Sequence, residues 1–290
     1  MSPSLLLEVL RPDFLLRNAL YGCMTVGLVC PLVGVYFLLR RMVFWGVALP
    51  QVSAAGLSLA FLLQGLGVGW LAGTEPGERH LAIMGSAALT AAAILALVLL
   101  ERRKAGFGEG RLGALYAASA GLCLLFVSWN PHGETAMLGL LKGEIVAISG
   151  HDLGILCGAF AVVAACFLAF QREFLLVSFD RDTAEILGRK VLLWEGLLYA
   201  LIGVTVSLGV MTAGPLVIFG FLVLPAMAAL PWARGIMSLS LLASLTGGAS
   251  AFIGFLLSYA FDLPLGPVAV CLAAASLGLS SLLRLALHRR

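Results

Sequence analysis

Long apolar stretches alternate with short polar segments along almost the whole chain. Nine stretches approach the length of about 20 residues that a helix needs to cross the hydrocarbon core of a bilayer. They cover residues 18–39, 43–70, 81–100, 112–129, 152–170, 193–212, 215–231, 236–260 and 265–285. The pattern therefore predicts an all-α, polytopic bundle of eight to ten transmembrane helices, with nine as the best count.

The sixth and seventh stretches are separated only by the break Thr-Ala-Gly-Pro at residues 212–215. They form either a hairpin or one broken or re-entrant element. A Gly-Pro break within apolar sequence frees backbone groups that must face protein or water, so Gly214 and Pro215 are a candidate hinge. Pro225 lies inside the seventh stretch and predicts a kink there, because it cannot donate a helical hydrogen bond.

The composition agrees with a chain that is dissolved in lipid. Hydrophobic residues make up 61% and charged residues 11%, whereas soluble domains carry about 25% charged residues. The basic residues are not interleaved with exposed aromatics as a nucleic-acid-binding surface requires. We therefore expect the lipid bilayer, and no nucleic acid, as a partner.

The positive charges predict the topology. With the N-terminus outside and nine spans, 14 of the 18 Lys and Arg residues fall in inner segments, and the outer segments hold only Arg11, Arg17, Arg79 and Lys142. Lys and Arg concentrate on the cytoplasmic side of membrane proteins, so the C-terminus is predicted to be cytoplasmic. Because the longest polar connection, 171–190, is too short for a soluble domain, residues 1–290 are predicted to form a single transmembrane domain.

The inner connection 171–190 contains a short helical pattern after Asp180. Ala184 and Leu187 can lie on one face of it, and Asp182 and Glu185 on another. Gly188 is a natural stop, and the following Arg-Lys pair suits the negative end of a helix dipole. The pattern indicates a short cytoplasmic helix held close to the membrane, and an ordinary polar turn is the alternative.

Chemistry-bearing side chains are scarce. His132 and His151 flank one outer segment that contains two glutamates, which suggests a weak metal-collecting or receptor-docking site, or simply solvated loop residues, since the spacing matches no known ligand pattern. No phosphate loop, HExxH motif or Ser/His/Asp set is present. We therefore predict no catalytic residue and no cofactor in this chain. Glu195 lies at the inner start of its span and can reach the interface. Other ionisable residues within the spans are scarce, which argues against a proton-coupled secondary transporter, since such a protein needs titratable groups near the middle of the membrane.

Six segments in the same order resemble the ABC-type zinc/manganese permeases. They are "LVGVYFLLRRMVFWGVAL", "LGALYAASAGLCLLFVS", "LLKGEIVAISGHDL", "REFLLVSFDRDTAEILGRKV", "GVMTAGPLVIFGFLVLPAMAAL" and "FDLPLGPVAV". The resemblance implies a dimeric permease of the cytoplasmic membrane, with cytoplasmic ATPase subunits that hold ATP and Mg and an external solute-binding protein. It also implies that the 171–190 segment couples to the ATPase, through Asp180, Asp182, Ala184, Glu185 and Gly188.

The resemblance implies import of zinc, manganese or iron, with a chelated metal, another small solute or a secondary transporter as alternatives. One departure bears on the substrate. Where the family usually reads "GDALSHA", this chain reads "GVALPQVSA". Val47 and Gln51 thus replace an Asp and a His that would share a helix face, and Pro50 is expected to bend the helix. Three explanations of the missing ligands remain. The metal crosses without direct ligation at this point, a partner subunit supplies the ligands, or the substrate is not a free divalent metal.

Overall fold

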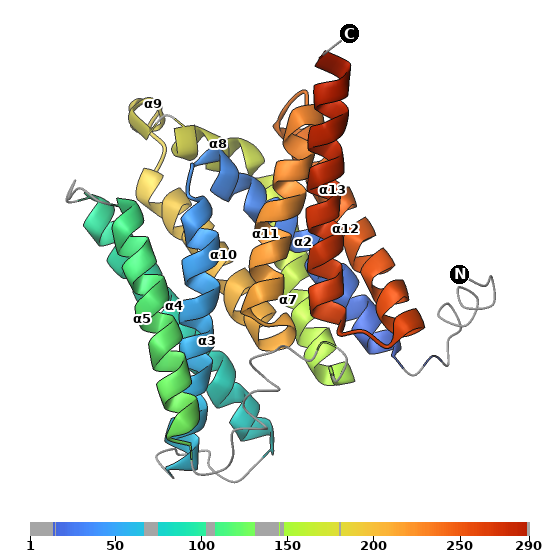
Figure 1. Ribbon diagram of the computed structural model, residues 1–290. Coiled ribbons are helices and arrows are strands. Elements are labelled where there is room, and N and C mark those ends of the chain that lie inside the picture. Colours follow the sequence, from blue (N-terminus) through green and yellow to red (C-terminus); the bar gives the residue numbers. More distant parts are fainter. Residues whose placement is uncertain are drawn as a thin grey trace. The chain divides into compact units, whose positions relative to one another are not determined.

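The computed structural model describes residues 14, 16–66, 75–102, 108–130, 145, 148–179 and 181–288. These residues form helices and connecting turns, and no strand occurs among them (Figure 1). Nine of the helices in this part of the chain are long and apolar enough to cross a membrane. The predicted all-α bundle and its span count are therefore confirmed.

The chain divides into two compact units, each assembled from separate stretches of sequence. The first contains residues 1–41, 144–169 and 216–290. Its elements are α2 (Arg17–Leu39), α7 (Gly150–Ala169), α11 (Pro215–Ala229), the 3-10 turn η2 (Leu230–Trp232), α12 (Ile236–Phe261) and α13 (Leu265–His288).

In the first unit α12 packs against both α2 and α13, and α2 packs against α7 (Figure 1). Glycines permit the closest of these contacts. A methyl group on Gly27 would lie 2.6 Å from Ala251 Cβ, and one on Gly254 would lie 2.8 Å from Ala269 Cα. Membrane helices associate by close packing rather than by hydrophobic burial, so these small residues decide which helices can meet.

The second unit contains residues 42–143 and 170–215. Its elements are α3 (Val43–Gly65), α4 (Glu75–Arg102), α5 (Gly108–Ser128), α8 (Gln171–Phe179), α9 (Arg181–Ile186) and α10 (Val191–Ala213). Helix α3 is the centre of this unit, because it packs against α4, α5 and α10. Gly56 and Gly85 face each other where α3 meets α4.

Proline does not interrupt the helices that contain it. Helix α3 runs on through Pro50, and α11 runs on through Pro225. The break at residues 212–215 does separate two helices, because α10 ends at Ala213 and α11 begins at Pro215. The sixth and seventh predicted stretches are therefore two helices rather than one.

Candidate functional site

The predicted cytoplasmic segment folds into two short helices, α8 and α9. Helix α9 ends in a hydrogen-bonded cap, in which the Gly188 amide donates to the Glu185 carbonyl and the Arg189 amide donates to the Ala184 carbonyl, each at 3.0 Å. This paired pattern requires a residue in the left-handed conformation, and Gly188 has a φ of 70°. The expected helix and its stop at Gly188 are confirmed, and the ordinary turn is excluded.

A small apolar cluster anchors α9 to its neighbours. Ala184 is fully buried and packs with Val177 of α8 and Val191 at the start of α10. The small alanine side chain suits the point where α9 meets α8 and the start of α10, because protein interiors are closely packed. The cluster makes α9 a fixed projection rather than a loose loop.

Aromatic rings and one ion pair add to this anchor. Phe170, Phe174 and Trp194 form a set of ring contacts with centroids 5.2–6.4 Å apart. The Arg189 guanidinium lies 3.2 Å from the Glu173 carboxylate. These contacts connect α8 to the start of α10, which is one of the candidate membrane-crossing helices.

Large apolar side chains project outward from the same segment. Ile186 is 84% exposed, Leu187 62% and Phe179 61%. Leu187 follows the last residue of α9 and is exposed, whereas Ala184 is buried, so the two residues do not form one buried apolar face. Sequence reasoning missed Ile186 and Phe179; their only signal was an apolar residue in a polar connection, and such exposed apolar groups mark contact surfaces.

The acidic residues of the segment are only partly placed. Glu185 is exposed on α9. Asp182 lies within α9, and its side chain is not described; Asp180 lies outside the described residues. A carboxylate at Glu185 can therefore reach a partner, while the other two coupling residues stay predictions.

Val47 and Gln51 both lie in α3, where each is half-buried. They are four residues apart in a continuous helix, so they share one face as the sequence predicts. Valine offers no ligand atom and glutamine only a neutral amide. Among the described residues no group of three His, Cys, Asp or Glu side chains could hold a metal ion.

Hydroxyl groups form a buried seam in the second unit, where α3, α4 and α10 meet. The Ser53 and Ser86 hydroxyls are 2.7 Å apart across α3 and α4, and the Ser86 hydroxyl donates to the Ser207 carbonyl of α10 at 3.5 Å. Thr90, one turn along α4 from Ser86, is buried and its hydroxyl has no hydrogen-bond partner. This seam could not be predicted from the sequence, because isolated serines in apolar stretches carry no distinctive spacing.

Gly214 occupies a backbone conformation that favours glycine. It has a φ of 81° and a ψ of 161°, and its amide closes α10 by donating to the Val210 carbonyl at 2.9 Å. Side chains other than hydrogen are strained in this region. Pro215 then starts α11, since its missing amide hydrogen would be unpaired at a first helical position anyway. Pro225 is buried in the middle of α11.

Of the two histidines that are predicted to flank one outer segment, the structure describes only His151. His151 is exposed in the first turn of α7. Its neighbour Asp152 takes part in the helix start, where the Ser149 hydroxyl donates to the Asp152 carboxylate at 2.7 Å and accepts from the Asp152 amide at 3.2 Å. His132 lies outside the described residues, so the predicted pairing of the two histidines stays a prediction.

Known proteins resemble this chain over nearly its whole length. The zinc transport system membrane protein TroC of Treponema pallidum is 30% identical over 263 residues, which are 89% of this chain and 85% of that protein. The manganese transport system membrane protein MntC of Listeria monocytogenes is 25% identical over 269 residues, covering 93% of this chain and 90% of that protein.

Solved structures share the fold. The structure described as PsaBC from Streptococcus pneumoniae in complex with Fab superimposes with a TM-score of 0.80 at 22% identity, over 97% of this chain and 95% of that chain. An inward-facing structure described as a putative metal-chelate type ABC transporter gives a TM-score of 0.67 at 15% identity, over 93% of this chain and 85% of that chain.

The sequence profile described as the ABC 3 transport family matches residues 13–284. Among the described residues, that range covers the nine candidate membrane helices, except for the last residues of α13, and it includes the α8–α9 segment. This multi-pass membrane protein therefore belongs to the ABC 3 transport family.

Proposed function

We propose that this chain is the permease subunit of an ATP-driven importer that carries a divalent transition metal across the cytoplasmic membrane. Family membership supports transport, and the relatives named for zinc and manganese transport support the metal. Zinc and manganese are the first candidates and iron is the third.

The observation that carries this proposal is the anchored projection formed by α8 and α9. Burial of Ala184 against α8 and α10 fixes the projection, while Ile186, Leu187 and Phe179 point away from it as a contact surface. A motor that pushes on α9 acts on α10 through the Ala184–Val191 contact. The segment therefore suits a docking element for a separate ATPase. The proposed coupling residues are Asp180, Asp182, Ala184, Glu185 and Gly188, of which the buried Ala184 and the cap residue Gly188 hold the segment in position rather than touch the partner.

The remaining partners follow from an import reaction. ATP and Mg are held by the cytoplasmic ATPase subunits, because no phosphate loop occurs in this sequence. An external solute-binding protein delivers the substrate, and two permease subunits, identical or different, enclose the pathway. Residues 1–290 act as one permease domain with the N-terminus outside, and Gly214, Pro215 and Pro225 absorb backbone changes as the pathway alternates.

The substrate path is proposed to pass the Val47 and Gln51 face of α3. Because this pair supplies no strong metal ligand, the ion passes it without direct coordination, or ligands come from the second permease subunit. A chelated metal is the second candidate function, and the same observation favours it: a chelate carries its own ligands and needs only a neutral path.

Reconstitution of the chain with its ATPase and binding protein tests the proposal. We expect ATP-dependent accumulation of zinc or manganese in vesicles, measured by elemental analysis. Uptake only when a chelator accompanies the metal would favour the second candidate. Accumulation driven by a pH gradient on the chain alone would contradict both.

A further inference from the structure

Two aromatic rings connect α10 to the start of α3 in the second unit. The Trp45 and Tyr199 rings are stacked, with their centroids 5.6 Å apart and their planes inclined by 18°. Trp45 is buried in the first turn of α3. A stacked aromatic pair stabilises a contact beyond the area that it buries, so these rings hold the two helices together at one defined point.

The first turns of α10 are attached to the α8–α9 segment. Val191 packs with Ala184 of α9. Trp194 makes a ring contact with Phe174 of α8, with the centroids 6.0 Å apart. Eight residues separate Val191 from Tyr199, which is about 12 Å along a helix. Because α10 is unbroken over this distance, a displacement of α9 also displaces Tyr199.

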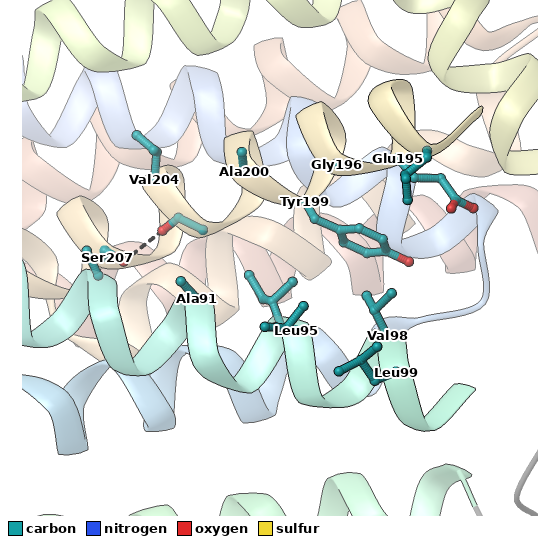
Figure 2. A pocket seen from close by; sticks show the side chains of 14 residues that line it. Ala91, Leu95, Val98, Leu99, Glu195, Gly196, Tyr199, Ala200, Val204 and Ser207 are labelled. Atoms are coloured by element: carbon teal, nitrogen blue, oxygen red, sulfur yellow. Dashed lines mark hydrogen bonds between the residues drawn. The ribbon is translucent and has the colours of Figure 1, made fainter. Parts of the chain in front are cut away.

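A groove of about 490 Å³ lies between α4 and α10. Figure 2 shows Tyr199 at the wall of this α4–α10 groove, with Gly196 and Ala200 beside it on α10. A methyl group added to Gly196 would meet nothing within 4 Å, whereas one added to Gly203 would lie 3.4 Å from Ile94 of α4. Helix α10 therefore has room to move toward α4 near Gly196, but it is already in contact with α4 at Gly203.

The second half of α10 is held to α4 by the buried hydroxyl seam. The Ser86 hydroxyl donates to the Ser207 carbonyl at 3.5 Å, four residues beyond the contact at Gly203. One half of α10 is thus fixed and the other half borders the groove. A displacement at Val191 should therefore tilt the helix about its fixed half, and Tyr199 lies on the half that moves.

We propose that Tyr199 is a positioning residue, which moves the Val47 and Gln51 face of α3 through its stack on Trp45 when the ATPase displaces α9. Trp45 precedes Val47 by two residues in the same continuous helix. Coupling between distant sites is carried by packed side chains and rigid helices, and every contact of this connection lies within the second unit. The inference rests on the proposed function and adds the link between the docking segment and the substrate path.

Uptake by the chain reconstituted with its ATPase and binding protein tests the link. In Tyr199→Leu we expect the zinc or manganese transported per ATP hydrolysed to fall about twofold to tenfold, the factor that the loss of one aromatic pair brings. Hydrolysis itself should continue, because the docking surface is unchanged. Tyr199→Phe keeps the ring and should keep the wild-type ratio. Phe167→Leu is the matched control, since it removes a ring contact with Tyr36 in the first unit, where the centroids are 4.9 Å apart, and should leave the ratio unchanged.

A double-mutant cycle with Trp45→Leu tests whether the two rings act together. Both substitutions break the same contact, so the double variant should transport no less per ATP than either single variant. Losses that multiply in the double variant would overturn the inference. So would a wild-type ratio in Tyr199→Leu, or an equal loss in Phe167→Leu, because the effect would then be general destabilisation.

Hydrogen exchange of the chain alone, in detergent, tests the same link without transport. Ala184→Gly weakens the anchor of α9, and we expect about twofold faster amide exchange in residues 43–51 of α3, within the factor that an alanine-to-glycine change brings in a helix. In a Tyr199→Leu background this response should vanish. A response that is absent with Tyr199 present, or that persists without it, would overturn the inference and leave the proposed function intact. A failure of metal uptake, in turn, would contradict the proposed function and leave this measurement valid.

Discussion

Glycine and alanine residues set how closely the helices of each unit approach. Gly27 is within reach of both Ala251 and Gly247 of α12, so α2 and α12 meet backbone to backbone. Gly121 of α5, in contrast, faces nothing within 4 Å. The same residue type therefore has opposite consequences at the two positions, and only the packing distinguishes them.

We predict that Gly27→Ala destabilises the protein by about 1–3 kcal/mol, the cost of forcing an extra carbon into a packed contact. The new methyl group would lie 2.6 Å from Ala251 Cβ and 2.8 Å from the Gly247 carbonyl oxygen. Thermal unfolding in detergent measures the change. Gly121→Ala is the control and should leave the melting temperature unchanged or raise it, because alanine is the better helix former.

At Gln51, replacement by alanine is predicted to lower uptake at low substrate concentration about threefold to tenfold, the factor that one lost hydrogen bond brings. The residue is half-buried on α3, so the fold should tolerate the change. Gln64→Ala, at the far end of the same helix, is the matched control. Equal uptake by wild type and Gln51→Ala at every substrate level would remove Gln51 from the pathway.

At the scale of elements, the α8–α9 segment is held by specific contacts although it is short. A helix of six residues is unstable alone in water, and here a glycine cap ends α9 and a buried alanine fixes its position. The exposed face is thereby presented in one orientation. A rigid element of this kind can transmit a movement of the docked ATPase to α10, whereas a flexible loop would deform instead.

We predict that Ile186→Asp abolishes most coupling between ATP hydrolysis and transport. Loss of a buried isoleucine contact with a partner costs about 1.5–3 kcal/mol, so transport-linked hydrolysis should fall at least about tenfold. Ile186 is 84% exposed in this chain, so its own fold should be unaffected, and Ile186→Leu should retain coupling. Full coupling in Ile186→Asp, together with full coupling in Glu185→Lys, would contradict the docking assignment.

At the scale of the whole molecule, the direction of insertion decides what each surface can bind. The α8–α9 segment can meet a cytoplasmic ATPase only if residues 171–190 lie inside the cell. The distribution of basic residues predicts that orientation. The connection between α12 and α13, which includes Leu263, should then lie outside.

Single cysteines at Glu185 and at Leu263, in a variant that lacks the six native cysteines, test the orientation. Both positions are exposed. A membrane-impermeant maleimide added to intact cells should label position 263 and spare position 185 until the membrane is permeabilised. Labelling of position 185 from outside would reverse the topology and remove the proposed docking of the ATPase.

The α8–α9 segment was only half predictable. The glycine stop and the buried Ala184 follow from local pattern, because caps and short helices depend on neighbouring residues. The outward position of Leu187 did not follow, since it depends on where α9 ends against α8 and α10. The Ser53–Ser86–Ser207 seam and the α4–α10 groove were also invisible, because each joins residues far apart in the chain.

The sequence by itself determined that the chain is helical, that nine helices in its described part are long and apolar enough to cross a membrane, and where most of them begin and end. A bilayer forces each spanning segment to satisfy its own backbone hydrogen bonds, so length and hydropathy suffice. The tertiary structure alone decided which glycines contact a neighbouring helix and which face open space. It also decided which apolar residues of the α8–α9 segment are exposed. Those properties depend on distances between separate helices, which no local pattern encodes.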